Sequence, residues 1–229
     1  MRILPMLLFG VWLTSLGHAS AKDNTMKLRS LGINGFELKT GGETLLIDPY
    51  VSRDHRRVSI PGVVRKHIKQ ADYIVLTHSH YDHIAAAPEL RDKLGIPIAI
   101  HETDAAYLKD PELNFSVAFD RPVSFEPDKL LKGGDKWVLN DGELRVFHTP
   151  GHTQGGISII GPGIVFSGDT LFKMGMGRTD LPGGDYDKLK ESIRRLLELP
   201  EQTVVYPGHG PETTIGDEMD NFQGFDNFI

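Results

Sequence analysis

The chain has 229 residues, of which 39% are hydrophobic and 24% are charged, a composition typical of one sizeable globular domain. The formal net charge of −6 argues against a broad basic surface for nucleic acid. The absence of cysteine excludes disulfides and thiolate metal ligands.

Residues 1–21 are typical of a secretory signal peptide. A basic residue near the start precedes the largely apolar residues 3–13, and Ala19-Ser20-Ala21 fits the small-x-small cleavage pattern. The apolar stretch is shorter than the ~20 residues that a membrane-spanning helix needs. We therefore expect a mature chain, residues 22–229, that forms a single domain, is exported to the periplasm or secreted, and keeps no stable membrane anchor.

Short extended segments alternate with turn dipeptides and with two helical segments along the rest of the chain. Apolar runs and alternating patterns predict strands over residues 28–33, 36–39, 44–47, 73–77, 98–100, 136–139, 143–147, 157–160, 164–167 and 203–206. A helix is predicted over 84–94, and Asp185 is expected to cap a second helix that ends before Pro200. Strands punctuated by helices in this way suggest two packed sheets with helices outside them.

Three histidines and an aspartate crowd the segment that follows the apolar run 73–77. The sequence there reads Thr77-His78-Ser79-His80-Tyr81-Asp82-His83. Residues two apart on an extended backbone project to the same side, so His78 and His80 face one way. Asp82 and His83 follow as the chain turns. Two pairs of ligands can thus face two metal ions, and a chance cluster is improbable in a chain with only ten histidines.

Three later strands also end close to a histidine or an aspartate that has a glycine beside it. These residues are His152, Asp169 and His209. Together with the first cluster they give five imidazoles and two carboxylates, a donor set suited to zinc or a similar first-row ion. Glycine beside each ligand lets the backbone come close to a metal.

The chain carries, in this order, His78-Ser79-His80-Tyr81-Asp82-His83, His152, Asp169 and His209. With these residues in this order it resembles the metallo-β-lactamase superfamily, over about residues 28–212. The resemblance implies an α/β fold, a four-layered αβ/βα sandwich with a metal centre at one sheet edge. It also implies that His78, His80 and His152 hold one ion, that Asp82, His83 and His209 hold the other, and that Asp169 bridges them. The segment from Gly177 to Asp185 looks like a loop of short glyoxalase II-like hydrolases, and a related loop occurs in persulfide dioxygenases.

Hydrolysis is the natural chemistry of such a centre. Two ions roughly 3.5 to 4 Å apart lower the pKa of bound water from 15.7 to about 7 and polarise a carbonyl. We expect a small-molecule ester, thioester or lactone as substrate, two Zn²⁺ per chain with Fe or Mn possible, and Asp82 as the residue that orients the nucleophile. The sequence indicates no oligomeric state.

Three alternatives to this hydrolase stay open. One is a mononuclear iron persulfide dioxygenase, and another is a class B-like β-lactamase, although many β-lactamases of the superfamily place cysteine or serine where this chain has Asp169. The third is a metal-binding protein without enzymatic activity, which the complete ligand set disfavours.

Several residues near the motifs have expected supporting roles. Asp48 follows a predicted strand and is a candidate partner for a ligand histidine, or a cap for the next loop. Arg178 and Asp180 are expected to form a buried ion pair that fixes the loop beside the site, with contact between Arg178 and an anionic substrate as the alternative. His148 is expected to make a structural hydrogen bond, and His101 to be solvated.

Overall fold

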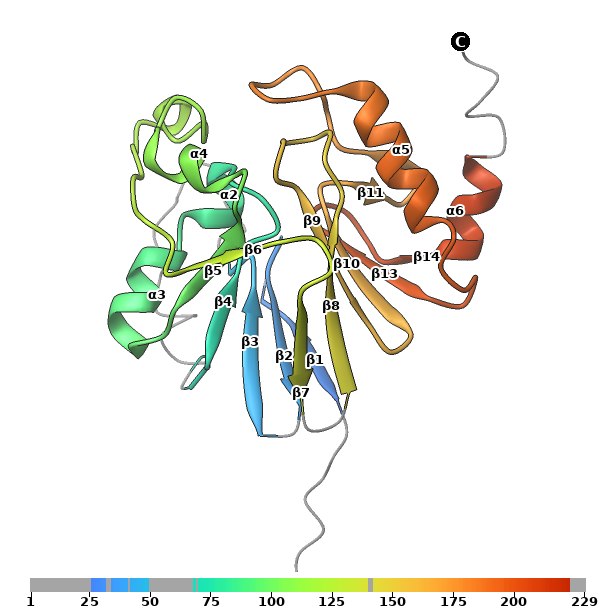
Figure 1. Cartoon of the computed structure of the whole chain (residues 1–229), viewed down its shortest axis with the longest axis horizontal. Coiled ribbons are helices and arrows are strands. Elements are labelled where there is room, and N and C mark those ends of the chain that lie inside the picture. Colours follow the sequence, from blue (N-terminus) through green and yellow to red (C-terminus); the bar gives the residue numbers. More distant parts are fainter. Residues whose placement is uncertain are drawn as a thin grey trace, which may run out of the picture.

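Two six-stranded sheets face each other, with helices on their outer faces (Figure 1). The computed structural model describes residues 26–31, 34–40, 42–49, 68, 70–139 and 142–222. The predicted signal peptide, residues 1–21, lies outside the described residues. Of the helices in the described part of the chain, none is long and apolar enough to cross a membrane.

The first sheet combines an antiparallel half with a parallel half. Its order is β1 (Lys27–Ser30), β2 (Phe36–Thr40), β3 (Glu43–Ile47), β4 (Tyr73–Val75), β5 (Ile98–His101) and β6 (Lys129–Leu131). Strands β1 to β3 pair antiparallel, whereas β3 to β6 are parallel and therefore need crossover connections. The segments between the parallel strands include α2 (Tyr81–Ile84), α3 (Ala87–Leu94), α4 (Ala105–Lys109) and the short 3₁₀ turn Val117–Phe119.

The second sheet is mostly antiparallel. Its order is β14 (Thr213–Thr214), β13 (Val204–Pro207), β10 (Ile164–Gly168), β9 (Ile157–Gly161), β8 (Gly142–His148) and β7 (Lys136–Leu139). Only β10 and β13 pair in parallel, across the helix α5 (Tyr186–Leu196). A two-stranded ribbon, β11 (Leu171–Phe172) and β12 (Gly175–Met176), and the helix α6 (Ile215–Asn221) complete the described elements.

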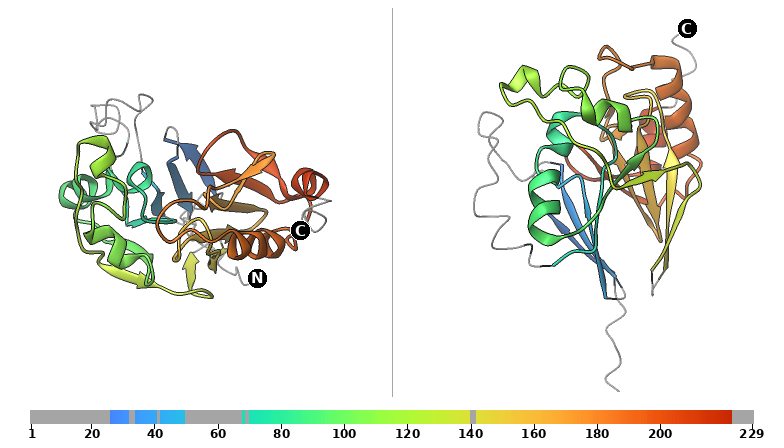
Figure 2. Two further views of the ribbon diagram at one scale, coloured as in Figure 1. Left: turned by 90° about the horizontal axis from the view of Figure 1, so that it is seen from above. Right: turned by 60° about the vertical axis from the view of Figure 1, so that its left-hand side comes forward.

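The central strands of the first sheet are apolar on both faces because both faces are covered. On β3, Leu45 and Ile47 pack between the sheets against Phe166 of β10, while Leu46 packs on the outer side with Leu90 of α3. A third cluster places α5 on the outer face of the second sheet. Figure 2 shows the resulting order of helix, sheet, sheet and helix. The predicted α/β four-layered sandwich is confirmed.

The structure differs from the prediction at the element that carries the ligands. The predicted helix over 84–94 is two helices, because Pro88 begins a new helix at the first turn of α3. The predicted strand over 73–77 ends at Val75, since the backbone N–H of Thr77 donates to the carboxylate of Asp48 and not to a neighbouring strand. The expected cap of α5 is confirmed by Asp185, whose Oδ1 accepts from the backbone N–H of Lys188 at 3.1 Å.

Candidate metal centre

Four strand ends bring the seven predicted ligands together. The segment after β4 carries His78, His80, Asp82 and His83, and the segments after β8, β10 and β13 carry His152, Asp169 and His209. The ligand atoms form three overlapping groups, within each of which all atoms lie within 4.8 Å of one another. The groups are His78 with His80 and His152, His78 with His83 and Asp169, and Asp82 with His83 and His209.

The first group, His78, His80 and His152, consists of buried imidazoles. Nδ1 of His152 donates to the backbone carbonyl of Arg178 at 2.7 Å, so its Nε2 keeps a lone pair, which lies 2.8 Å from Nδ1 of His80. Burial and the neighbouring His152 lower the pKa of His80 to about 3. Burial, followed by the charge of His83, lowers the pKa of His78 well below its ordinary value. The lowered pKa values keep the rings of His78 and His80 in the neutral form that binds metal.

The second group, Asp82, His83 and His209, is partly open to solvent. The side chains of Asp82 and His209 are 32% and 37% exposed, and Nε2 of His209 lies 3.0 Å from Oδ2 of Asp82. Burial alone would raise the pKa of Asp82, yet the charge of His83 and the hydrogen bond from His209 lower it to about 2. Burial would lower the pKa of His209, but hydrogen bonds to Asp169 and Asp82 raise it to about 9. Asp82 therefore remains a carboxylate at neutral pH.

Asp169 contacts both groups. Its Oδ1 lies 3.3 Å from Nε2 of His83, and its Oδ2 lies 3.4 Å from Nε2 of both His152 and His209. The backbone next to it has no room for side chains, because a Cβ on Gly208 would lie 2.1 Å from Oδ1 of Asp169. Glycine before His209 is therefore a steric requirement of this arrangement.

Asp48 fixes the orientation of one ligand ring, which is the first of the two roles expected for it. Its Oδ1 accepts from the backbone N–H of Thr77 at 2.7 Å, and its Oδ2 accepts from Oγ1 of Thr77 and from Nδ1 of His83 at 2.9 Å. Because Nδ1 of His83 carries the proton, Nε2 presents its lone pair to the cluster. Asp48 adopts a φ of +43°, an uncommon conformation for a residue other than glycine.

Sequence analysis missed Asp104, a buried carboxylate that joins two ligand-bearing loops. Its Oδ2 accepts from the backbone N–H of Ser79 at 3.0 Å and from Oγ1 of Thr153 at 2.8 Å, and its Oδ1 accepts from the N–H of Gly155 at 2.6 Å. Ser79 lies between two of the ligand histidines, and Thr153 follows a third. The position of Asp104 shortly after the strand β5 is the signal that could have identified it.

Asn34 is a second residue that sequence analysis missed. Its Nδ2 donates to Oδ2 of Asp82 at 3.1 Å and to the backbone carbonyl of Asp82 at 3.2 Å, and it lies 3.2 Å from Nε2 of His83. The amide is buried, and its Oδ1 has no hydrogen-bond partner among the described residues. Asn34 lies between the predicted strands over 28–33 and 36–39, where sequence analysis expected only a turn.

Other expectations near the centre had mixed outcomes. Arg178 and Asp180 do form an ion pair, with two contacts of 2.6 Å, but their side chains are 60% and 67% exposed, so the predicted burial is wrong. His148 makes the expected hydrogen bond, from Nε2 to the carbonyl of Gln154 at 3.0 Å. His101 is not solvated, because it is buried and stacks on His148 with ring centroids 4.1 Å apart.

The residues of both groups fit divalent first-row ions. Nε2 of His78 is buried and has no hydrogen-bond partner in the described part of the chain, which is the state of a nitrogen that faces a metal. Imidazole nitrogens with a few carboxylate oxygens and no thiolate are the donors that zinc, iron and manganese accept in proteins.

Comparison with known proteins supports this assignment. The family model of the metallo-beta-lactamase superfamily matches residues 30–209. The probable metallo-hydrolase YqgX of Bacillus subtilis (strain 168) is 36% identical over 204 residues, which cover 85% of this chain and 93% of that protein.

Two solved structures resemble the chain over most of its length. The BLEG-1 B3 metallo-beta-lactamase has a TM-score of 0.72 at 37% identity, covering 86% of this chain and 97% of that one. TTHA1623 in a di-iron-bound form has a TM-score of 0.71 at 32% identity, covering 86% and 98%. With its two-sheet sandwich and its cluster of histidines and aspartates, the chain belongs to the metallo-beta-lactamase superfamily.

Proposed function

We propose that the protein is an exported metal-dependent hydrolase that uses two metal ions, with zinc the first candidate, to attack an ester, thioester or lactone. The observation that carries the proposal is the position of Asp169, whose two oxygens reach His83 on one side and His152 on the other. A carboxylate between two groups of imidazoles suits a pair of cations that share it.

In this proposal, some residues of the chain hold the metal ions and one orients the attacking water. His78, His80 and His152 would hold one ion, while Asp82, His83 and His209 would hold the other. A pair of ions at this centre would supply a hydroxide at neutral pH and polarise the carbonyl that it attacks. Because the carboxylate of Asp82 is partly exposed and stays ionised, it would accept a hydrogen bond from the attacking water and orient it.

The names of the relatives support hydrolysis and leave the metal open. YqgX is named a probable metallo-hydrolase, and TTHA1623 was solved with two irons. Iron is therefore a candidate beside zinc, and manganese is compatible with the same donors.

The proposal is tested with protein purified without residues 1–21. We expect two metal ions per chain by inductively coupled plasma mass spectrometry, and turnover of at least one member of a panel of esters, thioesters and lactones. Removal of metal with a chelator should abolish that turnover, and added Zn²⁺ should restore it. Turnover that survives complete metal removal would overturn the proposal.

β-Lactam hydrolysis is a second candidate, favoured by one observation. The BLEG-1 structure, 37% identical to this chain, is named a B3 metallo-beta-lactamase. A chromogenic cephalosporin therefore belongs in the panel. A β-lactam turned over more efficiently than every ester, thioester and lactone tested would favour this second candidate.

Export is tested separately, on protein expressed with its own N-terminus. We expect intact-mass measurement to show loss of residues 1–21 and fractionation to show the protein outside the cytoplasm. Retention of Met1 on a cytoplasmic protein would contradict export and leave the hydrolase proposal standing.

A further inference from the structure

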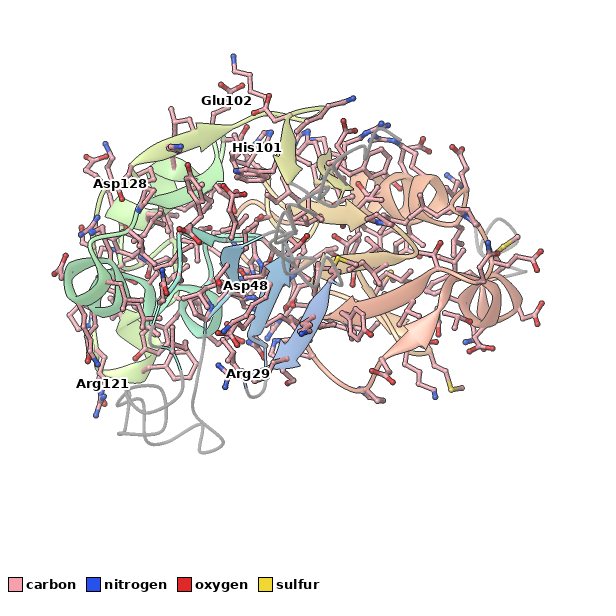
Figure 3. The ribbon with its side chains drawn as sticks, turned by 90° about the horizontal axis from the view of Figure 1, so that it is seen from below. Arg29, Asp48, His101, Glu102, Arg121 and Asp128 are labelled. Carbon is pink, nitrogen blue, oxygen red and sulfur yellow. The ribbon has the colours of Figure 1, made fainter. Side chains whose placement is uncertain are left out.

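A groove of about 310 Å³ runs along the edge where the two sheets meet. Its walls are Leu28 and Ser30 of β1, Phe36 of β2, Tyr206 and Pro207 of β13, and Glu212. The strands β1 and β2 and the strands β13 and β14 lie side by side at this edge in the view from above in Figure 2 and in the view from below in Figure 3. The space is about that of ten water molecules, at the lower end of ligand-pocket sizes.

Both walls of the groove include residues that lie close along the chain to residues at the second ligand group. On one wall, Phe36 follows two residues after Asn34, whose amide donates to Asp82. On the other wall, Pro207 and Gly210 flank His209, whose Nε2 lies 3.0 Å from Asp82. A substrate whose carbonyl lies at the second ligand group can therefore extend one arm into the groove.

Part of the wall of the groove is aromatic and well supported, beside the polar residues Ser30 and Glu212. The rings of Phe36 and Tyr206 lie 5.6 Å apart edge to face, and both rest on Phe166 of the core between the sheets. Leu28 packs against the same core. Aromatic rings held in this way bind an apolar group without first having to become ordered.

Among the described residues that line the groove, only Glu212 carries a charge. The two cations of β1 point elsewhere, because Lys27 and Arg29 lie on the opposite face of the strand from Leu28 and Ser30, where Arg29 pairs with Glu37 at 2.6 Å. An anionic arm would meet the carboxylate of Glu212 with no lining cation to offset it, whereas a neutral or cationic arm would not.

We propose that this groove is the substrate subsite of the enzyme and takes an apolar alkyl or aryl arm that carries no negative charge. The proposal rests on the hydrolase function proposed above. It specifies a hydrophobic ester, thioester or lactone as substrate and disfavours a conjugate whose arm ends in carboxylates.

The first test fills the groove with a large side chain at Ser30, an exposed residue of β1. Ser30→Trp places a large ring into it from an edge strand, and Lys27→Trp places the same ring on the opposite face of the same strand as the matched control. The substrates are ethyl acetate, ethyl octanoate and octyl acetate, of which the last two are isomers that lengthen the acyl arm or the alcohol arm.

We expect Ser30→Trp to lower kcat/KM about tenfold or more for one of the two long esters, and to leave ethyl acetate within about twofold. Lys27→Trp should change none of the three. Both variants should keep the metal content and melting temperature of the wild type. If Ser30→Trp changes all three esters equally, or none of them, the groove is not the subsite.

The second test reverses the charge at the groove. Glu212→Lys should raise kcat/KM for monoethyl suberate, whose arm ends in a carboxylate, about tenfold relative to ethyl octanoate. Glu198→Lys, at an exposed position after α5, is the matched control and should leave that ratio unchanged. Equal ratios in the two variants would contradict the assigned role of Glu212.

A binding measurement separates this proposal from the hydrolase proposal. If the metal-loaded wild type hydrolyses none of the esters, ester hydrolysis fails, and the groove is then tested by calorimetry with n-octylammonium. The wild type and Lys27→Trp should bind this cation, and Ser30→Trp should bind it at least about tenfold more weakly. Equal binding by all three proteins would overturn the subsite without reference to catalysis.

Discussion

The two halves of the metal centre are built differently. His78, His80 and His152 are buried and offer only imidazole nitrogens, whereas the second group adds the carboxylate of Asp82 and is partly exposed through Asp82 and His209. A closed group of imidazoles suits a firmly held ion, while a group that contains a carboxylate and faces solvent suits an ion that shares its coordination with substrate. Substitutions in the first half should therefore affect mainly metal binding, and substitutions in the second half should affect mainly the reaction with substrate.

The supports of the two halves differ as well. Asp104 joins the two loops of the first half through three hydrogen bonds. The second half is held by Asp48, which orients His83, and by Asn34, which reaches Asp82 from the turn between β1 and β2. Each support can be removed without touching a ligand, so the two halves can be weakened one at a time.

Asp169→Ala should have the largest effect, because this side chain contacts both halves. We expect loss of metal from both groups and a fall in kcat/KM on the order of 10⁴-fold. The fold should survive, since the sheets carry the core. Metal content and circular dichroism are measured together, and a variant that binds two ions with unchanged affinity would exclude the bridging role.

His209→Ala should come next and should affect the second half alone. We expect the stoichiometry to fall from two ions to one and kcat/KM to fall on the order of 10³-fold, since in the proposed mechanism this ion would help to generate and position the nucleophile. The melting temperature should change little, because His209 is partly exposed.

The same variant distinguishes a hydrolase from a persulfide dioxygenase. In a dioxygenase, a single iron would lie on His78, His152 and Asp169, and the loss of His209 would weaken the reaction by about 10- to 100-fold without changing the metal content. One iron per chain in both the wild type and His209→Ala, with persulfide-dependent oxygen uptake, would overturn the dinuclear hydrolase.

Asp104→Ala should weaken the first half without removing a ligand. The N–H groups of Ser79 and Gly155 and the hydroxyl of Thr153 would lose their acceptor, so we expect a loss of unfolding free energy of about 2–4 kcal/mol. The affinity for the first ion should fall about 10- to 100-fold. Asp104→Asn, which keeps an acceptor oxygen, should recover part of both losses. If Asp104→Ala lowers the free energy of unfolding but leaves the metal affinity measured by titration unchanged, Asp104 supports the fold and not the metal site.

The candidate ligands were predictable from the sequence because their signal is local. His78 to His83 lie within six consecutive residues, and His152, Asp169 and His209 each lie near a glycine and a predicted strand end. These residues come together once the strands that precede them belong to the same two packed sheets. The supporting residues have no such local signal, because Asn34 meets Asp82 across 48 residues and Asp104 meets Thr153 across 49.

In the fold, too, the features with a local sequence pattern were predicted and the others were missed. The strands over 136–139 and 157–160 and the cap at Asp185 were predicted well, because alternation and capping are local patterns. The short elements α4 and β6 were missed, since a helix of five residues and a strand of three are too short to show periodicity. The burial of His101 also escaped prediction, because its partner His148 belongs to the other sheet.

Asn34→Ala should have the smallest effect and should be confined to the second half. The amide holds Asp82 through its side chain and its carbonyl and lies 3.2 Å from Nε2 of His83, so its loss leaves both ligands less fixed. We expect the affinity for the second ion to fall about tenfold and the affinity for the first to stay unchanged.

Asn114→Ala is the matched control, because this buried amide donates to the carbonyl of Val123 and should affect stability alone. Asn34→Asp should not restore the affinity for the second ion, since a carboxylate there cannot donate a hydrogen bond to Asp82 and would repel it. Stepwise titration with Zn²⁺ reports both affinities, and identical curves for the wild type and Asn34→Ala would show that the turn contributes nothing to the metal site.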